Sequence, residues 1–143
     1  MTGDQDLSKS VIFARGEVNP PPWNQYFTGT CYVNELVPFD SPLGCIVGNV
    51  TFEPGCRNNW HLHHAGQILL ITGGRGWYQE EGKPARALQA GDVLEILPGV
   101  KHWHGAAADS WFVHLAIEPD LTGGPPEWFE PVSDEEYKKL DRS

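Results

Sequence analysis

The sequence has no long hydrophobic run and few basic residues. No apolar stretch approaches the roughly 18 residues that cross a bilayer, and residues 1–6 are acidic where a signal peptide would be basic and then apolar. Its 10 lysines and arginines against 19 aspartates and glutamates give a formal net charge of −9, and such a surface repels phosphate backbones and anionic lipids. We therefore expect a cytoplasmic protein that binds neither nucleic acid nor a membrane.

Cysteine is also scarce. The chain contains three cysteines, Cys31, Cys45 and Cys56, at wide spacings and without a CxxC motif, so neither a disulfide framework nor a thiolate zinc site is indicated. We interpret Cys45 and Cys56 as small core residues. A chain of 143 residues has the length of a single domain with one core.

Glycine and proline are abundant, and they separate short runs of β-branched and aromatic residues. The 16 glycines and 12 prolines predict many turns between short strands. We predict six strands, at residues 31–37, 45–53, 67–72, 76–79, 93–97 and 111–117. Because no helical pattern lies between them, they indicate an all-β sandwich or barrel over residues 30–118. The Gly-Gly-Arg-Gly segment at 73–76 is typical of a hairpin turn.

The two ends of the chain differ from this pattern. Residues 1–29 predict an arm that is extended at its three prolines and packs through Trp23, Tyr26 and Phe27. Residues 119–143 predict a loop and a short helix, because Ser133 and Glu136 have the spacing of a capping box. We expect this tail to cover an edge or end of the barrel through aromatic residues, namely Trp128, Phe129 and Tyr137.

All six histidines lie between positions 61 and 114. Alternate residues of a strand share a face, so His61 and His63 project together, as do His102 and His104. Gln67 is in phase with the first pair if the chain stays extended past Gly66. Such pairs can also face solvent or lie hydrogen-bonded in a core. Two pairs, each close to a turn, favour a site for a divalent transition metal.

His104 and His114 are candidates for acid–base catalysis. His104 would lie about 6 to 7 Å along its strand from His102, a distance that suits a base beside a metal. His114 shares a face with Phe112 and Ala116, where it is either a core histidine or a pocket residue, and a histidine of near-neutral pKa is the usual general acid or base. His64 is out of phase with His61 and His63 and is expected at the surface.

The substrate pocket is expected on the apolar face of the strand before the first histidine pair. Gly48 would leave room for a ligand there, beside Val50. The residues that we expect to bind substrate are Gly48, Val50, Leu69 and Phe112.

These motifs resemble those of the cupin superfamily, small β-barrels with a metal site. The first cupin motif is matched by Gly55, His61, His63, Gln67 and Gly74, with Gln67 in the place of a glutamate. The second is matched by Gly91, Gly99 and His102, while Leu97 and Ala106 replace its proline and asparagine. The resemblance spans about residues 44–118. It implies a cupin barrel in which the metal ligands are His61, His63, Gln67 and His102.

The glutamine ligand changes the expected chemistry. Four neutral ligands leave the full charge of the ion uncompensated, which strengthens it as a Lewis acid and stabilises a trivalent state less well. Manganese, iron and zinc would all accept these nitrogen and oxygen ligands.

Nearly the whole chain is similar to the bacterial cupin-type hydroxynitrile lyases of the mandelonitrile lyase kind. The similarity is carried by residues 27–30, 50–55, 60–61, 66–67, 101–107 and 114–117. It implies that manganese is the bound metal, with iron or zinc possible. It also implies that a cyanohydrin is cleaved to an aldehyde and cyanide, with His104 removing the hydroxyl proton and His114 stabilising or protonating the cyanide.

Two alternatives stay open on the sequence. One is a metal-dependent cupin dioxygenase, and the other is a barrel that binds a small ligand or a metal without catalysis. In each case the partner would be a small molecule. The extended arm and the edge strands also predict a homodimer or a higher homo-oligomer.

Overall fold

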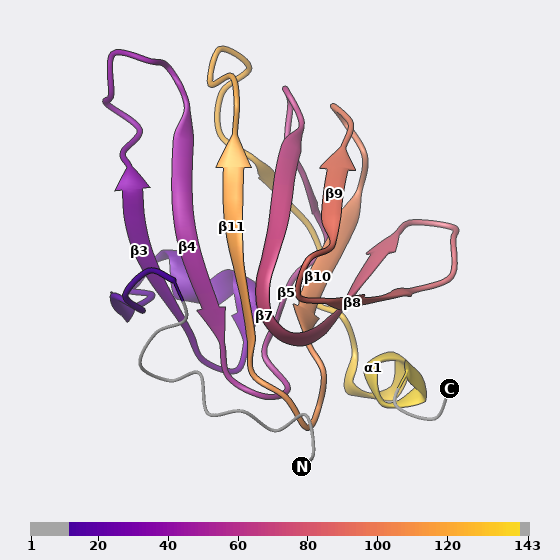
Figure 1. Cartoon of the computed structure of the whole chain (residues 1–143). Helices are drawn as coiled ribbons and strands as arrows, with labels where there is room; N and C mark the ends of the chain where they lie inside the picture. Colours follow the sequence, from indigo (N-terminus) through magenta and orange to yellow (C-terminus); the bar gives the residue numbers. More distant parts are fainter. Residues whose placement is uncertain (1–11, 141–143) are drawn as a thin grey trace.

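The computed structural model describes residues 12–140, which form a curled antiparallel sheet and one short α-helix (Figure 1). Within these residues the elements are β1 (Glu17–Val18), a 3-10 helix (Trp23–Tyr26), β2 (Phe27–Thr28), β3 (Cys31–Val37), β4 (Ile46–Phe52), β5 (Arg57–Asn58), β6 (His61–Leu62), β7 (Gln67–Glu80), β8 (Arg86–Gln89), β9 (Val93–Ile96), β10 (His102–Ala106), β11 (Phe112–Glu118), β12 (Glu127–Trp128) and α1 (Asp134–Leu140). The all-β prediction is confirmed.

The strands follow the order β1-β3-β4-β11-β7-β10-β5-β2, and the sheet curls so that its inner face encloses the core. β9 pairs with the first half of β7, and β8 pairs with its second half. β6 pairs with both β10 and β12. No helix in the described part of the chain is long and apolar enough to cross a membrane.

The prediction of a hairpin turn at residues 73–76 is wrong, because β7 runs through this segment without a break. The strand pairs with β11 up to Gly74 and with β10 from Gly76 onward, so it passes from one half of the sheet to the other. A Cβ on Gly74 would collide with the backbone of Trp111, and one on Gly76 would collide with Gly105 and Phe112. The glycines therefore allow close strand contact and a bend, not a chain reversal.

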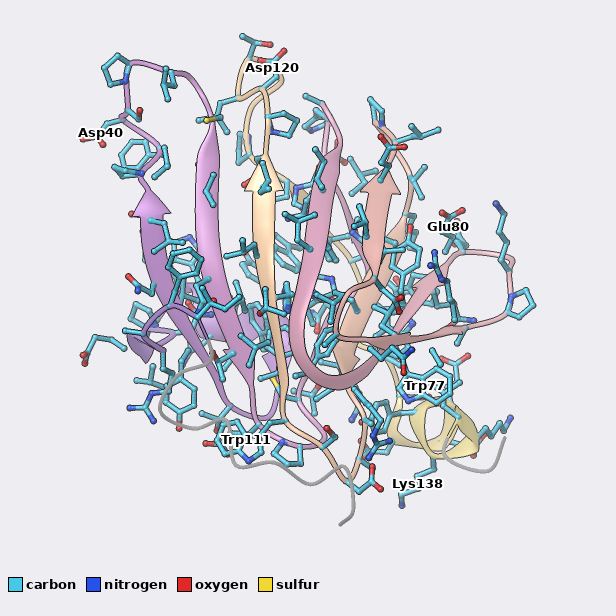
Figure 2. The ribbon with its side chains drawn as sticks, in the orientation of Figure 1. Asp40, Trp77, Glu80, Trp111, Asp120 and Lys138 are labelled. Atoms are coloured by element: carbon cyan, nitrogen blue, oxygen red, sulfur yellow. The ribbon has the colours of Figure 1, made fainter. Side chains whose placement is uncertain are left out.

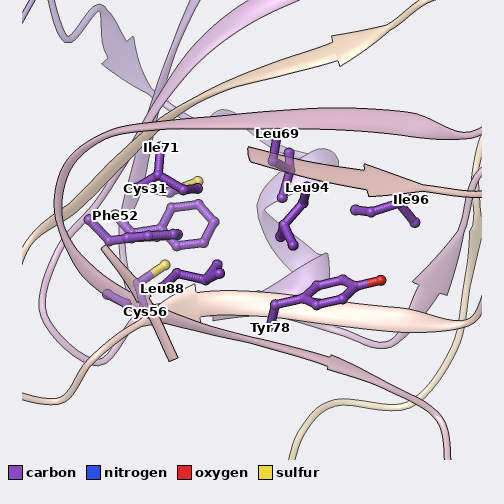
Figure 3. Packing of buried hydrophobic residues seen from close by; sticks show 11 residues of the cluster. Cys31, Phe52, Cys56, Leu69, Ile71, Tyr78, Leu88, Leu94 and Ile96 are labelled. Carbon is purple, nitrogen blue, oxygen red and sulfur yellow. The ribbon is translucent and has the colours of Figure 1, made fainter. Parts of the chain in front are cut away.

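The core lies between the two halves of the sheet (Figure 3). Phe52 from β4, Leu69 from β7 and Phe112 from β11 are completely buried there. Cys56 is a buried core residue as predicted, whereas Cys45 is only partly buried, and all three thiols are free. Each buried large apolar side chain stabilises the fold by about 1.5–3 kcal/mol.

The C-terminal helix forms at the predicted place. The backbone N–H of Glu136 donates to the Ser133 hydroxyl at 3.1 Å, which is the expected N-cap bond. Tyr137 is buried against Trp103, and Figure 2 shows Trp77 beside the same helix. The Arg57 guanidinium lies 4.2 Å from the centre of the Tyr137 ring and 2.6 Å from the Asp134 carboxylate. These contacts fix the helix on the outer face of β10.

The proline segment of the arm does not stay extended as predicted. The carbonyls of Pro20 and Pro22 accept hydrogen bonds from Asn24 and Gln25, so the chain turns into the 3-10 helix. The fixed φ of proline also suits the first turn of a helix, which explains the difference. Residues 1–11 of the predicted arm lie outside the described residues.

Candidate metal centre and active site

Two neighbouring antiparallel strands bring the histidine pairs together. The register of β6 and β10 places His61 directly opposite His102, and their ring centres lie 4.3 Å apart. His63 follows β6, with its ring centre 5.0 Å from that of His61, and Gln67 begins β7. The four predicted ligands, His61, His63, Gln67 and His102, are all buried.

The Nδ1 atoms of the three candidate histidine ligands are all anchored to oxygen acceptors. His61 Nδ1 lies 2.8 Å from the carbonyl of Asn59, and His102 Nδ1 lies 2.9 Å from the carbonyl of Val100. His63 Nδ1 lies 3.2 Å from a carboxylate oxygen of Glu118. These acceptors hold the proton on Nδ1 and leave the Nε2 lone pair free, which is the arrangement of a histidine that binds a metal.

Three buried acceptor atoms of this set have no hydrogen-bond partner among the described residues. They are Nε2 of His63, Nε2 of His102 and Oε1 of Gln67. Buried polar atoms are nearly always satisfied in native proteins, so three unsatisfied acceptors from one cluster indicate an absent partner that accepts their lone pairs. The donor set, imidazole nitrogens and one amide oxygen, fits a divalent transition metal.

His104 lies close to the same cluster. Ligand atoms of His61, His102 and His104 lie within 4.8 Å of one another, so geometry alone also allows His104 as a metal ligand. Unlike Nε2 of His63 and Nε2 of His102, however, Nε2 of His104 already has side-chain partners. Its Nε2 lies 3.1 Å from Nε2 of His114. We therefore place His104 beside the ligand set and not in it.

His104 and His114 form a buried imidazole pair. Asn58 lies against the pair, because its amide nitrogen is 3.3 Å from the ring nitrogens of His104 and its oxygen accepts the His104 backbone N–H at 2.9 Å. Phe52 stacks on the His104 ring with centres 5.6 Å apart. Nδ1 of His114 is buried without a partner among the described residues.

Burial keeps these imidazoles neutral at physiological pH. It lowers the pKa of His102 to about 4 and the pKa of His114 to about 3. Burial, and after it the neighbouring imidazoles, hold the pKa of His61 and of His104 well below the usual 6.5. Neutral rings are the form that binds a metal or accepts a proton.

Four of these histidines, His61, His63, His104 and His114, line a cavity of about 220 Å³ with mostly apolar walls. Its aromatic lining consists of Trp23, Phe27, Phe52 and Trp128. Of the residues predicted to bind substrate, Val50 lines the cavity. Gly48 shares the face of Val50, with open space where a Cβ would be, whereas Leu69 and Phe112 are buried in the core.

Trp128, Glu118 and Asn58 line the cavity but were not predicted as site residues. Trp128 stacks on His61 with ring centres 4.6 Å apart, and Tyr26 stacks on Trp128 with ring centres 4.4 Å apart. Glu118 continues the inward-facing alternation of His114 and Ala116, a signal that the sequence contains. Asn58 belongs to no sequence pattern that would mark it as a site residue. His64 is exposed, as expected, and pairs with Glu127.

Comparison with known proteins agrees with this geometry. The cupin domain family matches residues 48–117. An (R)-mandelonitrile lyase of Granulicella tundricola is 44% identical over 114 residues, which cover 80% of this chain and 87% of that protein. This chain belongs to the cupin family.

Solved structures place this cupin among similar barrels. A cupin-like protein of Thermotoga maritima superposes with a TM-score of 0.84 at 48% identity, covering 90% of this chain and 95% of that chain. The DMSP lyase DddQ of Ruegeria pomeroyi gives a TM-score of 0.62 at 23% identity, covering 81% of this chain and 58% of that chain. The second likeness shows the fold alone.

Proposed function

We propose that this cupin is a metal-dependent hydroxynitrile lyase that cleaves a cyanohydrin to an aldehyde and cyanide. The observation that carries the proposal is a neutral histidine pair directly beside a set of unsatisfied metal-ligand atoms, in one apolar cavity. The 44% identity to a protein named (R)-mandelonitrile lyase supports the same reaction.

The chain provides a ligand set for a divalent metal. His61, His63, Gln67 and His102 would hold the ion, which as a Lewis acid lowers the pKa of a bound hydroxyl. We propose manganese, with iron and zinc as the alternatives that these ligands accept.

The histidine pair accounts for the proton transfers. The His104 ring lies between the ligands and His114, with its centre 6.2 Å from that of His61 and 4.8 Å from that of His114, so His104 is the base for the hydroxyl proton. As the carbonyl forms, the C–CN bond breaks and its electron pair leaves with cyanide. His114 protonates the cyanide and regains a proton from His104 across the 3.1 Å between their Nε2 atoms. No oxidant is needed.

The cavity wall favours a small, neutral, apolar substrate. Among the described residues its lining contains no lysine or arginine, so no basic side chain there pairs with a substrate carboxylate. Its four aromatic side chains instead suit an aryl group. Three expectations stay predictions: that the protein works in the cytoplasm, that it forms a homodimer or a higher homo-oligomer, and that it binds neither nucleic acid nor membranes.

The test is cleavage of mandelonitrile by the metal-loaded protein in the absence of oxygen. We expect benzaldehyde and cyanide to be released, His104→Ala to lower kcat by about 10²–10⁴-fold, and exposed His64→Ala to match the wild type. A cupin dioxygenase would instead need oxygen. Full activity of His104→Ala with its metal bound would contradict the assigned base.

A further inference from the structure

The three candidate histidine ligands differ in what anchors them. Main-chain carbonyls hold Nδ1 of His61 and His102, and these anchors carry no charge. Nδ1 of His63 is held instead by the side chain of Glu118, at 3.2 Å. Glu118 is therefore the one charged group in direct hydrogen-bond contact with this ligand set among the described residues.

The ligand set itself brings no negative charge to the site. Its three imidazoles are uncharged when they bind a metal, and Gln67 is a neutral amide. Within the described lining of the cavity, Glu118 is also the one acidic residue. Glu80 lies near His102, but its carboxylate already accepts from Tyr78 and pairs with Lys83, both at 2.9 Å. Among the described residues, Glu118 is therefore the group that would compensate the charge of a bound cation.

The position of Glu118 relates it to Gln67. The antiparallel register of β11 and β7 pairs Ile117 with Ile68. Glu118, which follows Ile117, therefore lies opposite Gln67, which precedes Ile68, on the adjacent strand. Both side chains line the cavity. The cupin motif has a glutamate where this chain has Gln67. The carboxylate of Glu118 lies on the neighbouring strand and contacts His63.

We propose that Glu118 is a positioning residue for the metal. It holds His63 with its proton on Nδ1 and Nε2 directed inward, and it supplies through this hydrogen bond the negative charge that Gln67 lacks. A carboxylate behind a ligating histidine raises the basicity of the ring and strengthens metal binding. The inference rests on the proposed metal site but not on the proposed reaction.

The experiment measures the affinity of the metal-free protein for Mn²⁺ and Zn²⁺ by calorimetric titration. Glu118→Gln removes the charge and Glu118→Ala also removes the acceptor, so we expect each to weaken binding by about 10–100-fold, Ala more than Gln. The matched control is Glu127→Gln, because Glu127 contacts exposed His64 at the same 3.2 Å outside the cavity. This control should bind both metals like the wild type.

A double variant separates charge compensation from a merely structural role. In a Gln67→Glu background the ligand set carries its own charge, so Glu118→Gln should weaken binding by less than about threefold. The metal-free variants should unfold at the wild-type temperature. Unchanged affinity in Glu118→Gln, or an equal loss in both backgrounds, would overturn the inference. A wild-type protein that binds neither ion would overturn the metal site as well.

Discussion

Nε2 of His104 lies 3.1 Å from Nε2 of His114, and both rings are buried. One proton lies between two neutral imidazoles, since a second proton would place a positive charge where water cannot reach it. The same burial that makes the pair useful for proton transfer also makes it sensitive to acid.

This sensitivity predicts how the stability of the metal-free protein depends on pH. Burial lowers the pKa of folded His114 to about 3, whereas in the unfolded chain it has its ordinary value of 6.5. Unfolding therefore takes up a proton between these values, and the free energy of unfolding falls with decreasing pH by about 1.4 kcal/mol per unit for this group. Urea unfolding at pH 7, 6 and 5 measures the slope. It should be shallower in His114→Asn, and an unchanged slope would contradict the account.

The ligand set is tested by metal content. The unsatisfied Nε2 of His63 and the occupied Nε2 of His104 predict that His63→Ala loses the metal and His104→Ala keeps it. Elemental analysis of the purified variants decides between them. Loss of metal in His104→Ala with retention in His63→Ala would instead favour the group of His61, His102 and His104.

Trp128 is predicted to contribute to substrate binding. Its ring stacks on His61 and forms part of the cavity wall, so Trp128→Ala removes an aromatic contact for an aryl substrate. Aromatic pairs contribute about 0.5–1.5 kcal/mol beyond area burial, so KM for mandelonitrile should rise about 2–13-fold. Trp128→Phe should show a smaller change, and Trp111→Phe, at a residue outside this lining, should show none. An unchanged KM in Trp128→Ala would place the substrate elsewhere.

The C-terminal helix is predicted to stabilise the fold without taking part in the chemistry. Tyr137 is buried against Trp103, its hydroxyl donates to the carbonyl of Ala106, and its ring lies under Arg57. Tyr137→Ala should lower the free energy of unfolding by about 3–5 kcal/mol, measured in urea. Tyr137→Phe keeps the ring and should lose only about 1 kcal/mol. Metal affinity of the folded variants should not change.

Much of the fold was predictable because its signals are local. β3 has the predicted limits, and β4, β9 and β11 differ from their predictions by one residue at one or both ends. The serine cap of α1 was also found, since a capping box depends on residues three positions apart. The histidine spacing alone predicts that the candidate ligands share one face of the strands.

What escaped prediction depends on contacts between distant parts of the chain. The glycines of β7 are typical of turns, but close packing against Trp111 and Gly105 keeps the strand continuous. β8 buries only Leu88, so it shows no alternation of apolar and polar residues. Trp128 reaches His61 from more than 60 positions away because β12 pairs with β6, and no local pattern signals that pairing.

The most direct test of the central claim combines elemental analysis of freshly purified protein with mandelonitrile cleavage before and after a chelator. We predict near-stoichiometric transition metal and oxygen-independent release of benzaldehyde and cyanide. This activity should be lost with the metal and restored when the metal is returned. Cleavage that survives complete removal of the metal, or a metal-loaded protein that leaves mandelonitrile intact, would contradict the account.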